Sequence, residues 1–259
     1  SRRQRQMCIR DRSIMVPAIG VVMVNRKTSM IGDALSHSAL AGVGMGLILG
    51  FDPLIGMVII CIFAAYLIEI IRHRFPQYGD MATAIIMSIG LGLASILSDF
   101  APGGTSFESY LFGSIASVTT TDVINVAIVF VLVLFASIKE YAGLLAIAID
   151  HNTARLSGVN VKWINAVFTL LSAVTIAMAV KLVGALMVTS LIVLPVATTL
   201  IVARSYKQTL ITTIVLGIIY MMTGITASYY YDIKPGGAII IAALVGMFVF
   251  FVYGKIKKR

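Results

Sequence analysis

Long apolar runs separated by short polar breaks make up most of this sequence. Each run approaches the roughly 20 residues that an α-helix needs to cross the hydrocarbon core of a bilayer. Inside a bilayer a helix satisfies its own backbone hydrogen bonds, so the pattern predicts an all-α, polytopic transmembrane bundle of about eight spans. We expect these spans at residues 30–50, 54–71, 81–98, 119–137, 163–180, 182–203, 208–227 and 237–253.

The N-terminal region departs from this pattern. An apolar stretch at 14–25 is too short to cross a bilayer as a helix, so we interpret it as a truncated first helix. The preceding residues 1–13 are polar and predict a non-native or disordered tail, with a single transmembrane domain at 14–259; a native cytosolic or amphipathic tail is the alternative. Five residues of this tail are arginines: Arg2, Arg3, Arg5, Arg10 and Arg12.

Composition agrees with a membrane protein and narrows the possible chemistry. Hydrophobic residues make up 59% of the chain and charged residues 12%, whereas soluble domains carry about 25% charged residues. No soluble catalytic domain therefore has room to fold. The formal net charge is +9, but the basic residues cluster at the ends of apolar runs, where they set membrane topology. We expect a multi-pass protein in contact with the lipid bilayer and not with nucleic acid.

Asp33 and His37 form the sharpest candidate site. Both fall early in the run 30–50, and a spacing of four residues puts their side chains on one face of a helix. Ionisable residues are costly inside a membrane and usually functional. A carboxylate oxygen and an imidazole nitrogen one turn apart can share a divalent cation, whose charge the aspartate offsets. The alternatives are proton handling, or a structural role in which Asp33 caps the helix and His37 hydrogen-bonds a neighbouring helix.

The glycines that follow on the same run predict close helix packing. The segment GVGMGL at 42–47 lacks the third glycine of GxGxxG and follows no strand, whereas Gly42 and Gly46 form a GxxxG face. The sequence contains no GxxxxGK[ST] motif, so any energy from ATP must come from another chain. An intramembrane hydrolase is disfavoured, because there is no HExxH motif and no paired nucleophile and base.

Two connections between the runs are longer than simple turns. The first, at 100–118, mixes proline and glycine with an apolar stretch and predicts an external loop leading into a short interfacial or re-entrant helix. The second, at 138–163, is the largest cytoplasmic connection. Asp150 or Asn152 can cap a short helix there that ends at Gly158. We expect this helix to lie at the membrane surface.

Four stretches bring a family resemblance, which covers the chain from about Ile14 to its C-terminus. They are RKTSMIGDALSHSALAGVGMG (26–46), YLFGSIASVTTTDV (110–123), KLVGALMVTSLIVLPVATTL (181–200) and SYYYDIKPGGAIII (228–241). In this order they resemble the signature stretches of bacterial permeases for zinc, manganese or iron in ABC-type uptake systems, and the last stretch is most similar to the zinc-type members. Members of that family begin with an additional half-helix, which is missing here.

The resemblance implies a transport subunit, not an enzyme, in a bacterial cytoplasmic membrane. Its expected partners are a second permease copy in a homodimer, cytoplasmic ATPase subunits and an external metal-binding protein. No cofactor is expected to stay bound, and the transported ion is zinc or, alternatively, manganese or iron. A proton-coupled secondary transporter is the competing class.

The resemblance also assigns residues to two roles. Asp33 and His37 match the acidic and histidine positions that the family associates with metal passage. The segment matching the helix that docks on the ATPase comprises Asp150, His151, Asn152, Thr153, Ala154, Arg155, Leu156, Ser157 and Gly158.

Overall fold

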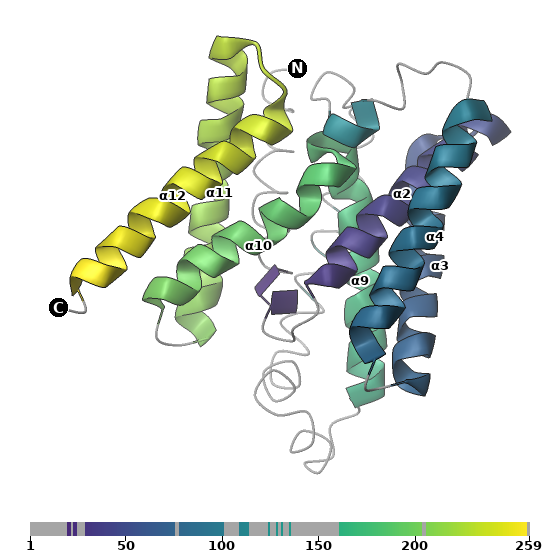
Figure 1. Cartoon of the computed structure of the whole chain (residues 1–259), viewed down its shortest axis with the longest axis horizontal. Coiled ribbons are helices and arrows are strands. Elements are labelled where there is room, and N and C mark those ends of the chain that lie inside the picture. The colour runs from purple at the N-terminus through teal and green to yellow at the C-terminus, as the bar shows by residue number, and fades with distance from the viewer. Residues whose placement is uncertain are drawn as a thin grey trace.

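The structure is a computed structural model of the chain. It describes residues 20–21, 23–24, 29–75, 78–100, 109–113, 161–203 and 206–257, with single positions at 124, 128, 131 and 135. Long helices run through most of these residues (Figure 1), and they are α2 (Met30–Leu49), α3 (Pro53–Arg74), α4 (Gly79–Phe100), α9 (Val161–Val183), α10 (Ala185–Val202), α11 (Tyr206–Tyr231) and α12 (Pro235–Lys257). Within the described part of the chain, seven helices are long and apolar enough to cross a membrane.

The predicted all-α transmembrane fold is confirmed. Seven of the predicted spans correspond to these helices. The span expected at 119–137 lies outside the described residues, apart from four positions that are helical and exposed. The tail at 1–13 also lies outside them, and so does most of 14–25, where Gly20, Val21, Met23 and Val24 are helical.

Helix α2 is the central element of the described bundle. It is the most buried and the least hydrophobic of the seven span candidates in that part of the chain. It packs mainly against α4 and α3, with α9 beside α3, whereas α10 packs mainly against α12 and also contacts α2. The described helices therefore form two groups, α2–α3–α4–α9 and α10–α11–α12, and α2 meets α10 where the groups touch.

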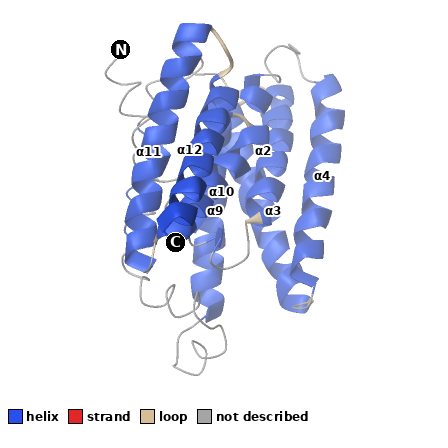
Figure 2. Cartoon of the chain, turned by 60° about the vertical axis from the view of Figure 1, so that its left-hand side comes forward, coloured by secondary structure: helices blue, strands red, loops and turns tan. Residues whose placement is uncertain are grey.

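The beginning of α2 lies inside the bundle. Figures 1 and 2 both show it at mid-height, whereas α3 and α4 extend further at that end. The start of α2 is thus not level with the ends of α3 and α4. The first turns of α2 consequently lie between neighbouring helices and not at the end of the bundle.

Glycines set the distance between α2 and α3. A Cβ atom added to Gly42 would lie 2.5 Å from the carbonyl oxygen of Gly56 and 2.6 Å from the Cα of Met57. Because both neighbours are backbone atoms, no side-chain rotation can make room for it. A Cβ on Gly46 would lie 2.9 Å from the Cα of Pro53. The packing role predicted for the GxxxG face is confirmed.

A glycine also sets the boundary between α9 and α10. The sequence pattern placed that boundary at Lys181, but α9 continues through Lys181, which is buried, to Val183. The break falls at Gly184, where φ is 92°, a left-handed value that glycine adopts without steric cost. A Cβ there would also collide with the backbone of residues 111–113. Those residues form the end of a short helical turn at 109–112 and the position after it, so part of the predicted interfacial or re-entrant helix is present and packs on this break.

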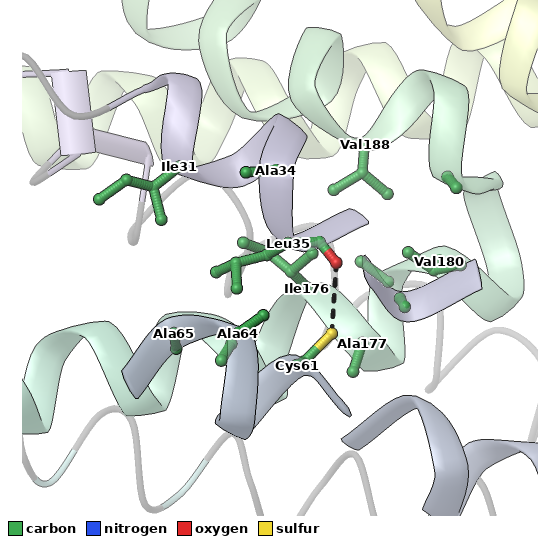
Figure 3. Packing of buried hydrophobic residues seen from close by; sticks show 14 of the residues in the cluster. Ile31, Ala34, Leu35, Cys61, Ala64, Ala65, Ile176, Ala177, Val180 and Val188 are labelled. Atoms are coloured by element: carbon green, nitrogen blue, oxygen red, sulfur yellow. Dashed lines mark hydrogen bonds between the residues drawn. The ribbon is translucent and has the colours of Figure 1, made fainter. Parts of the chain in front are cut away.

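The main core lies where α2, α3, α9 and α10 converge (Figure 3). Alanines at 34, 64, 65 and 177 keep the helices close, and larger side chains such as Leu35 and Ile176 fill the space between them. Cys61 is a free, fully buried thiol that donates a hydrogen bond to the carbonyl oxygen of Leu35 at 3.3 Å. It therefore packs as a small core residue.

Candidate functional site

Asp33 and His37 lie in the first two turns of α2, within the bundle. Ser29 occupies the N-cap position of this helix, so Asp33 is not the cap that one sequence interpretation allowed. Instead Asp33 lies in the first turn, where the positive end of the helix dipole stabilises a carboxylate. The Asp33 carboxyl group therefore lies near the positive end of the α2 dipole.

The two side chains face each other along the helix. His37 Nε2 lies 3.8 Å from Asp33 Oδ1, and the side chains are 13% and 32% exposed, respectively. This separation exceeds a hydrogen bond. The other ring nitrogen, Nδ1 of His37, is buried and has no hydrogen-bond partner among the described residues. The alternative that His37 bonds a neighbouring helix therefore finds no support in the described part of the chain.

Thr189 of α10 also contacts the carboxylate of Asp33. Its hydroxyl donates a hydrogen bond to Asp33 Oδ1 at 2.9 Å, across 156 positions of sequence. The accepting oxygen is the same one that faces His37. Thr189 is not among the predicted site residues, because a threonine in an apolar span carries no local signal for a partner on another helix.

This arrangement offers donors of the kinds that divalent metals bind. A carboxylate and an imidazole suit zinc and other first-row transition ions, and a hydroxyl bonded to the carboxylate orients it. Among the described residues there is no group of three or more His, Cys, Asp or Glu side chains that could hold a metal. One chain therefore supplies two strong ligands from its described part, fewer than the four that a closed structural zinc site uses.

The second predicted site is not placed by the structure. Residues 150–158, expected to dock on an ATPase, lie outside the described residues. Their role consequently rests on the sequence alone.

The chain is similar to a known family and to individual members of it. The family model described as "ABC 3 transport family" matches residues 12–254. The high-affinity zinc uptake system membrane protein ZnuB of Haemophilus influenzae is 30% identical over 235 residues, covering 89% of this chain and 89% of that protein. The manganese transport system membrane protein MntC of Listeria monocytogenes is 26% identical over 240 residues, covering 93% of this chain and 86% of that protein.

A solved structure gives the same result for the fold. The structure of PsaBC from Streptococcus pneumoniae in complex with Fab contains a chain that matches with a TM-score of 0.86 at 26% sequence identity. The match covers 96% of this chain and 90% of that chain. The resemblance based on four sequence stretches is thereby confirmed: the chain belongs to the ABC 3 transport family and is a multi-pass permease subunit of the metal ABC type.

Proposed function

We propose that this chain forms the membrane pathway of an ATP-driven importer of a divalent transition metal ion, and that Asp33 and His37 bind the ion during its passage. The observation that carries the proposal is the facing carboxylate and imidazole, 3.8 Å apart, in the first turns of a helix that begins at mid-height of the bundle. A divalent cation loses its hydration there, and a nearby negative charge offsets part of that cost. Because the protein supplies only a small number of ligands, the ion is bound weakly enough to be released.

Zinc is the proposed ion. Imidazole suits zinc, whereas manganese sites recruit more carboxylate, carbonyl and water oxygens. The names of the relatives do not decide between the two metals, since ZnuB is named for zinc and MntC for manganese. Growth of a zinc-import-deficient strain carrying this chain, compared with a manganese-import-deficient strain, tests the choice. Rescue of the manganese strain alone would overturn it.

The proposed partners follow from the missing ATP-binding motif in the sequence and from the family of the chain. ATP hydrolysis is assigned to separate cytoplasmic subunits, because the sequence has no GxxxxGK[ST] motif. A second permease copy is proposed as homodimer partner, and it or water supplies the remaining metal donors. An external metal-binding protein delivers the ion. The setting is a bacterial cytoplasmic membrane, with the basic ends of the spans inside.

The metal pair is tested by Asp33→Asn and His37→Ala in cells that produce the complete import system. Each change should abolish most metal uptake at normal membrane abundance, because the first removes the charge and the second the nitrogen ligand. Asp99→Asn is the matched control, since Asp99 is exposed in the last turn of α4. Wild-type uptake in both site variants would show that the pair is structural.

The docking segment is tested by Leu156→Glu. A charge on the apolar side of a packed helix should weaken its interface with the ATPase, and should uncouple ATP hydrolysis from transport. Leu156→Met is the control, since it keeps the volume and the apolar character. Binding of the external protein should not change. Normal ATPase co-purification together with normal uptake in Leu156→Glu would refute the assignment of 150–158.

A further inference from the structure

We infer that Thr189 is a positioning residue that makes metal affinity depend on how α10 packs against α2. The inference rests on the proposed function of Asp33 and His37 as metal ligands. It starts from one contact: Thr189 Oγ1 donates to Asp33 Oδ1 at 2.9 Å, on the oxygen that faces His37 Nε2. The hydroxyl thus fixes the carboxylate in the orientation that the pair needs.

The alternative for a threonine in an apolar helix is to bond its own helix, and this chain shows that alternative on α10 and α9. The hydroxyl of Thr199, also on α10, donates to the carbonyl oxygen of Pro195 at 2.8 Å. The hydroxyl of Thr175 on α9 donates in the same way to Leu171 at 2.8 Å. Thr189 instead reaches across to another helix. Its hydrogen bond therefore depends on the relative position of α2 and α10.

That bond crosses the contact between the two helix groups. Asp33 belongs to the group α2–α3–α4–α9, and Thr189 belongs to α10–α11–α12. A shift of one group against the other would lengthen the bond and release the carboxylate. Partners of this kind around a metal ligand typically change metal affinity by about 10–100-fold when they are removed. Movement of α10 against α2 would therefore change the affinity of Asp33 and His37 for the metal.

The packing at this contact leaves room for such movement. A Cβ atom on Gly32 would lie 3.5 Å from Cδ1 of Ile192 and 4.0 Å from Cγ2 of Thr189. These are ordinary distances to the ends of side chains, in contrast to the backbone contacts at Gly42. Side-chain ends can rotate, so α10 is held against α2 less tightly than α3 is. An importer that binds its ion on one side and releases it on the other requires such an adjustable contact.

The experiment measures equilibrium binding of Zn²⁺ and of Mn²⁺ to the full chain purified with its co-purifying subunits. Thr189→Val removes the hydroxyl at nearly constant shape and should raise the half-saturating metal concentration by about 10–100-fold. Thr189→Ser should restore most of the affinity. Thr199→Val, the matched control on the same helix, should bind as wild type does. Thr189→Ala serves if Thr189→Val does not fold, as thermal melting will show.

A wedge tests the dependence on packing. Gly32→Leu should push α10 away from α2 and weaken binding to a similar degree, and combining it with Thr189→Val should add little, because both changes break the same bond. Any of three results would overturn the inference: wild-type affinity in Thr189→Val and Thr189→Ala, equal losses of affinity in Thr189→Ser and Thr189→Val, or full additivity of Thr189→Val with Gly32→Leu. In any of these cases, Asp33→Asn and His37→Ala separate the two hypotheses. If these variants also bind metal normally, the proposed function is wrong. If they lose metal binding, only the role of Thr189 is wrong.

Discussion

Helix α2 meets different neighbours along its two halves. Around Gly42 and Gly46, its backbone touches the backbone of α3 so closely that a single Cβ atom cannot be added. Around Gly32 and Asp33, on the side of α10, it meets side-chain ends and one hydroxyl, whereas α4 packs closely on the backbone of Ser38. The C-terminal half, around Gly42 and Gly46, contains no ionisable group, and we call it the fixed half. The N-terminal half contains both ionisable residues of the helix, Asp33 and His37, and we call it the polar half.

The difference shows how one helix can be both fixed and functional. Close backbone packing holds α2 in the group with α3 and α4, because no rearrangement short of separating the helices relieves it. The polar half is then held in a fixed position opposite α10, a neighbour that packs on it less tightly. A ligand pair needs precise placement by its own helix, and a transport step needs an adjustable partner opposite. The two halves of α2 meet these two needs separately.

The largest effect is expected from Gly42→Leu, which breaks the fixed half. The added side chain meets the backbone of Gly56 and Met57, and overpacking of this kind costs about 1–3 kcal/mol or more. Membrane abundance and thermal melting should both fall. Gly92→Leu is the control, because Gly92 is an exposed helical glycine with open space around it. Equal abundance and equal melting of the two variants would show that the α2–α3 contact does not fix the helix.

The next effect is expected from His37→Asp, which alters the polar half and leaves the fixed half intact. Replacing the imidazole by a carboxylate changes a mixed nitrogen and oxygen pair into an oxygen pair, which suits manganese better than zinc. The ratio of zinc to manganese uptake should fall by on the order of tenfold, while abundance stays near that of wild type. His37→Ala, which loses both metals, is the comparison variant. An unchanged ratio would remove His37 from the metal ligands.

The sequence predicts the spans well and their ends less well. A bilayer demands about 20 apolar residues per helix, so the runs are visible without knowledge of the tertiary contacts. The boundary between α9 and α10 was placed at the charged Lys181, but it falls at Gly184. The reason is tertiary: the backbone of residues 111–113 lies against Gly184, and only the folded chain shows that approach.

For the candidate site, the sequence supplies the pair but not its surroundings. The spacing of Asp33 and His37 predicts their shared helix face, because helix geometry is local. It does not predict where the pair lies in the bundle, since the length of the run 30–50 predicts an ordinary span, while α2 begins at mid-height of the bundle. Nor does it predict Thr189, whose partner lies 156 positions away. A threonine in an apolar span is equally able to bond its own helix, as Thr199 does.

The smallest effect is expected from Gly50→Ala, at the end of α2 beyond both halves. Gly50 adopts φ 75° as it ends the helix, and its N–H donates to the carbonyl oxygen of Gly46. A left-handed conformation costs an alanine about 1–2 kcal/mol, and no atom lies within 4 Å of the added Cβ. Strain is therefore the whole effect.

Gly184→Ala is the comparison variant that separates backbone strain from a packing effect. Gly184 also has a positive φ, but an added Cβ there would meet the backbone of residues 111–113. Thermal melting should fall slightly in Gly50→Ala and further in Gly184→Ala. Metal uptake per folded molecule should stay normal in Gly50→Ala, because this end of α2 is separated from Asp33 and His37 by the glycine-packed half. Reduced uptake at an unchanged melting temperature would mean that the end of α2 takes part in transport, and the division of the helix into a fixed half and a functional half would then be wrong.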